Sequence, residues 1–447
     1  MLYVWFSRSF KAKCLFFAFL LIGIISPTIS YAGVSGRLGI MLQNDNRQYI
    51  ENKYLEEQGD FIFTNKEYAL RGGLSFSLRQ SIEPSYSSSA GKNKNALYQL
   101  FIEKKQKLSP SSSANFALGR IQRVDGLGFY FIDGGNVDVQ IKNWMISAYA
   151  GKPGRIDNFR SLSGKMISGM DVSTHQSGLD FSGIDALHAR LGWQRYRADS
   201  GDKQDRINWS LHGSKVKKQF KQLLSSLDIY FKGTWLPETD KAEDVIASIN
   251  THWYRKINIR LTHETYQPVS PYLTFREQFY AIYSRGYQKT LAGEFNYQLT
   301  KSRRISLRQR HTSREFGVDG YGYSVAYFLR QAAGAQWLFQ YDRLDLNIDS
   351  TESYYLELNV SLNSRLRGRF GAAMQKQEKY LYGKNDARAF EMYFEKMLHT
   401  DLFVKLTSSY IFNSRLEDEY RIGFRLDYYF DDRITDIISK YAGTENP

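Results

Sequence analysis

The sequence predicts an all-β protein, a transmembrane antiparallel β-barrel of about 20 to 22 strands. Residues 420–430 carry apolar side chains at even positions and polar ones at odd positions up to Asp427. This period of two makes one strand face oily and the other polar. Similar segments recur from residue 36 onward with little sign of a second layer to cover them. A closed barrel in lipid satisfies this pattern, because lipid covers the oily face and closure leaves no unpaired edge.

The clearest strands are those whose two faces differ most, at 68–79 and 290–300. Each run is about ten residues long, which is what a tilted strand needs to cross a bilayer. The same alternation occurs near 36–43, 207–213, 227–234, 245–253, 257–265, 323–330, 335–341, 354–362, 366–374 and 402–410. The pattern is unclear at 45–66 and 274–284, so the strand number stays open within the range.

Connections between these segments alternate in length, as expected for short periplasmic turns and longer outer loops with both termini periplasmic. The short ones lie at 255–256, 301–303, 363–364 and 399–401, and the long ones at 267–287, 315–320 and 377–386. Loops such as 45–66 or 153–166 could fold inward and close the bore.

Residues 1–32 have the features of a secretory signal peptide. Three cations, Arg8, Lys11 and Lys13, precede an apolar run at 14–25, and Ser30-Tyr31-Ala32 offers a cleavage site after Ala32. The only cysteine, Cys14, leaves with this segment, so we predict no disulfide, thiolate metal site or cofactor in the mature chain.

The rest of the chain is predicted to form one barrel domain, 33–431, followed by a periplasmic tail, 432–447. In the tail Ile434, Ile437 and Tyr441 recur at helical spacing, which is compatible with a short helix that contacts a periplasmic partner. A frayed tail with chance apolar residues explains the same spacing.

Without the three signal cations the formal charge falls from +14 to +11. A basic balance is typical of proteins that bind nucleic acid, anionic surfaces or anionic solutes, and secretion excludes nucleic acid. The mean hydropathy of −0.47 is compatible with a barrel, since only alternate residues face lipid.

The final strand resembles the C-terminal assembly signal of bacterial outer-membrane proteins. The residues that carry the resemblance are Arg421, Gly423, Leu426, Tyr428 and Phe430. It implies an outer-membrane location, contact with outer-membrane lipids and recognition by the barrel assembly machinery.

Two rows of arginine are predicted to face the lumen. Arginine on the lipid side at mid-bilayer would cost roughly 2 to 4 kcal/mol each, which assigns the arginine face to the interior. The rows are Arg304, Arg308 and Arg310, and Arg365, Arg367 and Arg369; the same rule adds Arg37, Arg71, Arg79, Arg190, Arg260, Arg421 and Arg425. Against them stand the inward carboxylates Glu264, Glu294, Glu357, Glu391 and Asp427. Such a lumen favours anions, although bracing of the wall by arginine pairs is an equally good interpretation.

Residues 118–153, from Leu118-Gly119-Arg120 to Ala150-Gly151-Lys152-Pro153, resemble porin-like barrels of the alginate-export type. The resemblance implies a basic lumen through which an acidic polysaccharide leaves the cell. Ile121 stands where that family has Gln directly after Gly-Arg.

A catalytic interpretation depends on His175 and Ser177, which resemble the His-x-Ser of outer-membrane phospholipases. Gly178 stands where that family has Asn, and a chance pair explains the match, so we predict no enzyme. The remaining histidines, His188, His212, His252, His263 and His311, lie on different strands without metal-ligand spacing.

The sequence therefore favours an outer-membrane, porin-like channel for passive passage of anionic solutes. Two alternatives stay open: an export barrel for an acidic exopolysaccharide, and a structural or docking barrel for a periplasmic or surface partner.

Overall fold

The structure is a computed structural model of the 447-residue chain. It describes residues 32–431 with gaps at 48–49, 83–93, 126–127, 155–163, 180–183, 199–200, 217–223, 255, 268–286, 316–318, 332–333, 347–349, 364, 379–385 and 414–417. The predicted signal peptide and the predicted tail at 432–447 lie outside the described residues, apart from Ala32.

The described residues form one antiparallel sheet of 22 strands. The strands are β1 (Ala32–Arg47), β2 (Ile50–Asn65), β3 (Leu70–Ser81), β4 (Lys94–Ser109), β5 (Ser112–Asp125), β6 (Gly128–Ile141), β7 (Trp144–Gly154), β8 (Gly164–Leu179), β9 (Ile184–Ala198), β10 (Lys203–Val216), β11 (Leu224–Leu236), β12 (Lys241–Trp253), β13 (Ile257–Tyr266), β14 (Gln288–Thr300), β15 (Arg303–Arg314), β16 (Gly320–Arg330), β17 (Ala335–Leu346), β18 (Ser350–Asn363), β19 (Leu366–Gln377), β20 (Asp386–His399), β21 (Leu402–Asn413) and β22 (Glu419–Asp431).

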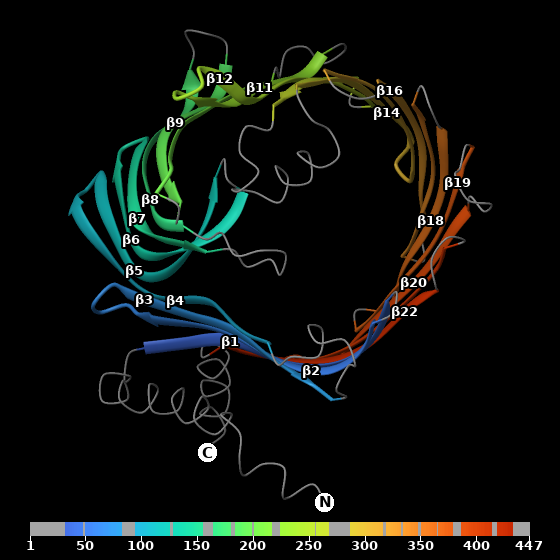
Figure 1. The fold of residues 1–447 in the computed structure, drawn as a ribbon, viewed down its shortest axis with the longest axis horizontal. Helices are drawn as coiled ribbons and strands as arrows, with labels where there is room; N and C mark the ends of the chain where they lie inside the picture. The colour runs from blue at the N-terminus through green and yellow to red at the C-terminus, as the bar shows by residue number, and fades with distance from the viewer. Residues whose placement is uncertain are drawn as a thin grey trace, which may run out of the picture.

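Each strand pairs with the next along the chain, and β1 pairs with β22 to close the barrel (Figure 1). The closed all-β fold is confirmed, with a strand number at the upper limit of the prediction. The segment 45–66 is not a loop but the β1–β2 hairpin, so it cannot fold inward as a plug. The segment 274–284 lies outside the described residues. No helix in the described ranges is long and apolar enough to cross a membrane.

The first residues of β1 pair with the last residues of β22, which places both ends of the described chain at one end of the barrel. We call this the terminal end and the opposite one the distal end. The short connections predicted from the sequence, such as Asn363 to Leu366, lie at the terminal end. The long ones, such as Tyr266 to Gln288, lie at the distal end.

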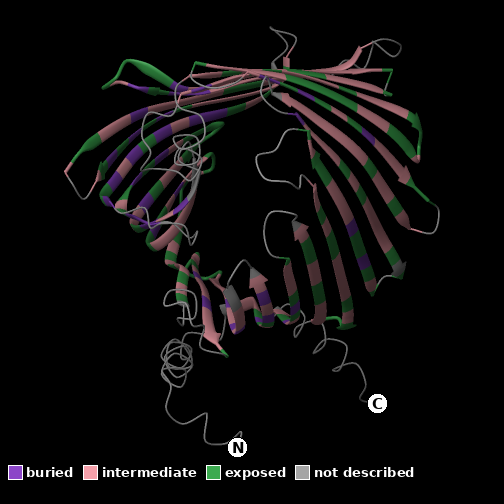
Figure 2. Cartoon of the chain, turned by 45° about the vertical axis from the view of Figure 1, so that its right-hand side comes forward, coloured by how far each residue is buried: buried purple, intermediate pink, exposed green. Residues whose placement is uncertain are grey.

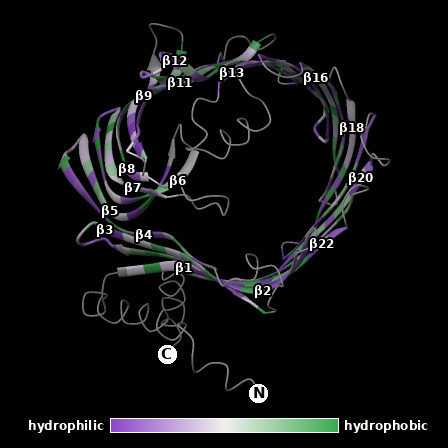
Figure 3. Cartoon of the chain, viewed as in Figure 1, coloured by the Kyte–Doolittle hydropathy of each residue, from purple (hydrophilic) through white to green (hydrophobic). Residues whose placement is uncertain are grey.

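Hydrophilic and hydrophobic residues alternate along the strands of the wall (Figure 3). Their exposure assigns them to the two faces. In β22 the outward Ile422 and Phe424 are 51% and 47% exposed, whereas Asp427, on the inner face, is 0% exposed. Large apolar side chains are similarly exposed on the outside of most other strands, for example Leu191 on β9 and Leu291 on β14. This band is the surface that lipid would cover.

Three glycines in register allow the wall to bend sharply inward. Gly119 pairs with Gly134, which pairs with Gly151. A methyl group on residue 134 would lie 2.0 Å from the Ala150 carbonyl oxygen, and one on residue 151 would lie 2.6 Å from that of Asp133. Gly119 has φ +119°, which side-chain-bearing residues rarely adopt. We call this row the glycine crease, and the strands β5–β9 around it the lobe (Figure 1).

The inner side of the lobe is filled by side chains. Tyr130, Ile132, Tyr149, Ile167 and Tyr196 form a buried apolar cluster. The Gln194 amide nitrogen donates hydrogen bonds to the hydroxyls of Tyr130 and Tyr149 at 3.1 and 2.7 Å. Buried residues accordingly gather on one side of the barrel (Figure 2).

Candidate solute pathway on the inner wall

On β15 the first predicted arginine row lies on the inner face. Arg304, Arg308 and Arg310 are all exposed, and Leu307 between them points outward and is 42% exposed. Their cross-strand partners on β14 are Gln298, Glu294 and Ala292. Arg308 and Arg310 therefore meet solvent inside the barrel, whereas the Arg304 guanidinium lies over the Phe328 ring.

Arg308 and Arg310 border a recess of about 350 Å³ in the inner wall. We call it the β15–β19 recess. Its other inward-facing residues are small or polar apart from Leu344: Gly322, Ser324, Gln340, Asp342, Thr351, Ser353 and Gln375. Gly322 makes room for Arg310, because a methyl group on residue 322 would lie 2.7 Å from Arg310 Nε.

No ion pair or hydrogen bond of the Arg308 and Arg310 side chains is found within the described part of the chain. Arg310 stands between Ala292 and Gly322, neither of which can accept a side-chain hydrogen bond. Arg308 stands opposite Glu294, whose carboxylate accepts a hydrogen bond from Asn296 at 2.7 Å. Both guanidinium groups therefore keep donors for a ligand, and Arg is suited to planar carboxylate or phosphate groups.

One carboxylate lies in the same recess and limits its positive charge. Asp342 accepts a hydrogen bond from the Gln340 amide at 2.7 Å. In and beside the recess three cations, Arg260, Arg308 and Arg310, stand against two carboxylates, Glu294 and Asp342. The net charge is positive, and the recess also offers acceptors and hydroxyls. It can hold an anion that carries donor groups of its own.

The second predicted row, on β19, is partly engaged. Arg369 lies 3.9 Å from Glu391, and Arg367 is opposite Glu395, which is 3.4 Å from Lys405. Arg365 is an exposed residue of the turn before β19, and its carbonyl oxygen accepts a hydrogen bond from Met397 N of β20 at 2.8 Å. Arg365 directly precedes Leu366, the first residue of the strand, and its place in the lumen row stays a prediction.

Several other predicted lumen arginines are held in ion pairs. Arg71 lies 3.7 Å from Glu103, Arg79 is 2.7 Å from Glu56, and Arg190 is 3.2 Å from Asp171. Arg421 lies 3.6 Å from Asp45, and Arg425 lies 2.7 Å from Asp427. Arg260 is exposed on the inner face opposite Glu294, and Arg304 lies 4.0 Å from the Phe328 ring. These pairs correspond to the bracing interpretation for much of the wall.

The carboxylates Glu56, Asp60, Glu103, Asp171 and Asp342 were missed by sequence reasoning. They occupy inward positions of β2, β4, β8 and β17. Odd or even position within a strand indicates which residues face inward, but β2, β4 and β8 were not identified as strands from the sequence. The lumen is thus less basic than the sequence count indicated.

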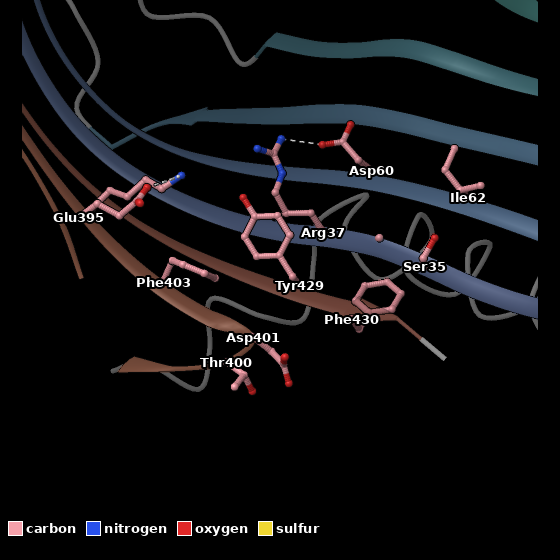
Figure 4. A pocket seen from close by; sticks show the side chains of 12 residues that line it. Ser35, Arg37, Asp60, Ile62, Glu395, Thr400, Asp401, Phe403, Tyr429 and Phe430 are labelled. Carbon is pink, nitrogen blue, oxygen red and sulfur yellow. Dashed lines mark hydrogen bonds and ion pairs between the residues drawn. The ribbon is translucent and has the colours of Figure 1, made fainter. Parts of the chain in front are cut away.

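Where β1 meets β22, a second cavity of about 830 Å³ opens at the terminal end (Figure 4). Arg37 donates a hydrogen bond to Asp60 at 2.6 Å across it. Lys405, Glu395 and Asp401 also line the cavity. Its charges are mixed, so this mouth lacks the unpaired cations of the β15–β19 recess.

Three histidines share one row of the inner wall: His175 pairs with His188, which pairs with His212. They lie on different strands, as expected, and the register brings them into one row; the rings of His175 and His188 are 6.4 Å apart. No group of three or more metal-binding side chains is arranged around a metal position in the part of the chain that the structure describes. Ser177 lies on the same inner face, whereas the phospholipase resemblance implies a lipid-facing serine.

Arg120 of the Gly-Arg segment lies on the outer face, not in the lumen. Its Nε and one terminal nitrogen donate to both Asp133 oxygens at 2.6 Å, and the other terminal nitrogen donates to the Leu97 carbonyl at 2.8 Å. The Arg120 side chain therefore braces the outside of β4–β6.

The assembly-signal residues alternate between the two faces of β22. Gly423 and Arg421 lie on the inner side, and Leu426, Tyr428 and Phe430 on the outer side. The Phe430 ring packs 5.7 Å from Phe61 and 6.2 Å from Tyr428. Recognition of this strand by the assembly machinery stays a prediction.

No protein-family model matches the chain. No curated protein matches it either. Among solved structures, the barrel is similar to the ferric enterobactin receptor PfeA, with a TM-score of 0.56 and 8% identity over 89% of this chain and 81% of the receptor. OpdK from Pseudomonas aeruginosa gives a TM-score of 0.42 and 9% identity over 90% of this chain and 99% of OpdK. OccAB2 from Acinetobacter baumannii gives a TM-score of 0.45 and 10% identity over 90% of this chain and 98% of OccAB2.

At these identities the likeness extends to the fold alone. That fold is a closed barrel of the outer-membrane type, which agrees with the exposed apolar band and with strand closure. The chain is an outer-membrane-type β-barrel.

Proposed function

We propose that this protein is a passive outer-membrane channel biased toward small anionic solutes, with both termini in the periplasm. The observation that carries the proposal is the pair of exposed arginines, Arg308 and Arg310, without partners in the described chain and beside a recess in the inner wall. Fixed cations lower the free energy of an anion in a pore, and weak binding lets it leave again.

The acceptor groups of the same recess support weak rather than tight binding. Asp342 repels a second negative charge, while Thr351 and Ser353 offer hydroxyls that replace water around a polar solute. The arginines held in ion pairs elsewhere brace the wall. The anion preference of the lumen therefore depends on different arginines from those that stabilise the barrel.

The test is the reversal potential in planar bilayers under a salt gradient. We expect anion preference for the unchanged protein and a lower anion-to-cation permeability ratio for Arg308→Gln combined with Arg310→Gln. A fall of about fivefold corresponds to about 1 kcal/mol, the Coulomb energy of two unit charges about 4 Å apart in water. Arg365→Gln, in the turn, is the matched control and should leave the ratio unchanged.

Cation preference in the unchanged protein would contradict the proposal. An acidic exopolysaccharide is the alternative cargo, and a polyuronate added from the terminal side separates the two interpretations. Sustained block or passage of long polyuronate chains, with no bias among small ions, would favour export. A docking role for the tail at 432–447 stays a prediction.

A further inference from the structure

Two cations face each other on the outside of the barrel at the distal end. Arg197 of β9 and Lys203 of β10 are direct cross-strand partners and both are exposed. They point outward, because the side chains at the alternate positions of β9, Gln194 and Tyr196, face inward and are only 1% and 4% exposed. Like charges directly opposite each other destabilise a strand pair.

Two carboxylates lie near this pair, Asp202 in the β9–β10 turn and Asp205, which interacts electrostatically with both Arg195 and Lys203. Arg195, on the same face, donates to both oxygens of Asp205 at 2.7 Å. No ion pair or hydrogen bond of the Arg197 or Lys203 side chains is found among the described residues. Lys152, exposed on β7, adds a third cation to this rim, and its cross-strand partner Asp133 is held by Arg120. The rim of β7–β10 therefore carries an excess of positive charge.

Directly below this rim lies an apolar surface. Leu191, Trp193 and Met170 are 60%, 40% and 48% exposed, and Trp235 on β11 is 38% exposed. The Arg195 guanidinium lies 5.3 Å from the centre of the Trp193 ring. Tryptophan beside arginine at the edge of an apolar band is typical of the membrane–water interface, where lipid head groups lie.

A different arc of the distal rim is neutralised. On β17 and its neighbours, Arg343 lies 2.8, 2.9 and 3.4 Å from Asp345, Glu352 and Glu378. Arg388 on β20 lies 3.2 Å from Asp386. The charge excess thus belongs to the β7–β10 arc and is not a general property of the rim.

We propose that the outer rim of β9–β10 binds the phosphate of a phosphorylated glycolipid in the outer leaflet, between Arg197 and Lys203. The acyl chains lie over Trp193 and Met170. A phosphate relieves the repulsion between the two cations and accepts hydrogen bonds from both. This assignment depends on the distal end facing the outer leaflet, the orientation stated above, and not on the solute that passes through the lumen.

The probe is diphosphoryl lipid A, titrated into the full-length mature barrel in a zwitterionic detergent and counted by native mass spectrometry. Arg197→Gln combined with Lys203→Gln should weaken lipid A binding by about tenfold or more, since each basic side chain at the membrane surface attracts anionic lipid. Lys376→Gln combined with Arg388→Gln removes one Lys and one Arg from the other arc, and should leave the affinity unchanged.

Lipid A without phosphate should bind both double variants and the unchanged protein equally weakly. Equal losses in the two double variants would overturn the site, and phosphatidylglycerol binding as tightly as lipid A would overturn the glycolipid assignment.

Heat-modifiable mobility on gels checks that each variant is folded. If the double variant does not fold, Lys203→Gln alone must weaken binding while Arg197→Lys retains it. Ion selectivity, measured in parallel, should be the same in all variants, which separates this site from the lumen.

Discussion

At the scale of single residues, the neighbours of an arginine decide what it can do. Arg37 and Arg79 lie 2.6 and 2.7 Å from carboxylates of β2 and hold neighbouring strands together. Arg310 has Ala292 and Gly322 on either side, so its charge stays available to a solute. The same residue type on the same inner face therefore serves two purposes.

A carboxylate placed opposite Arg310 should pair with it, so that its charge braces the wall and is no longer available to a solute. Ala292→Glu puts an acceptor at the cross-strand position, where opposite charges attract. We expect a lower anion-to-cation permeability ratio in planar bilayers, with the barrel folded as before. Ala292→Gln has nearly the same volume and no charge, and should keep the original ratio. An equal effect of both changes would show that size, not charge, controls passage at this point.

At the scale of elements, the strands differ in how clearly their sequences define them. In β15 and β22 the inner and outer positions are chemically distinct, and their faces could be assigned from alternation. β2 carries Glu57 outward and Ile62 inward, so its pattern is blurred and the sequence left the segment open. A register shift by one residue would exchange the two faces of a strand. The ion-pair partners across strands could therefore not be predicted without knowing the register.

The glycine crease is a second element that alternation alone could not reveal. Gly134→Ala should hinder assembly, because the added methyl group would lie 2.0 Å from a backbone oxygen that cannot move aside as a side chain would. Overpacking of this kind costs about 1 to 3 kcal/mol. The expected result is a lower temperature for loss of the folded band on gels.

Gly293→Ala is the matched control for the crease. Its methyl group would meet only Leu261 Cδ2 at 3.6 Å, which is ordinary contact. Gly293→Ala should leave the temperature at which the folded band is lost unchanged. If Gly134→Ala behaves like this control, the close approach of β6 and β7 is not required for folding.

At the scale of the whole molecule, closure, strand alternation and the short terminal turns could be predicted from the sequence. The balance of charge in the lumen could not, because carboxylates such as Asp60 and Asp171 lie on strands with indistinct faces. The recess at Arg308 and Arg310 depends on residues from five consecutive strands, β15 to β19, and only the register of their pairing brings these residues together. That the arginines face the lumen could be predicted from the sequence, since arginine facing lipid costs free energy.

The lobe also gives the barrel wall an uneven stiffness. Its inner side chains, including Tyr130 and Ile132, pack against one another and support β5–β9 from within. The arc from β15 to β19 has no comparable buttress among its described residues, and its inner arginines are exposed. Opening free energy follows local packing. Amide hydrogen exchange in detergent should thus be slower in β6–β8 than in β16–β19, and equal rates would contradict this view of a rigid half and a compliant half.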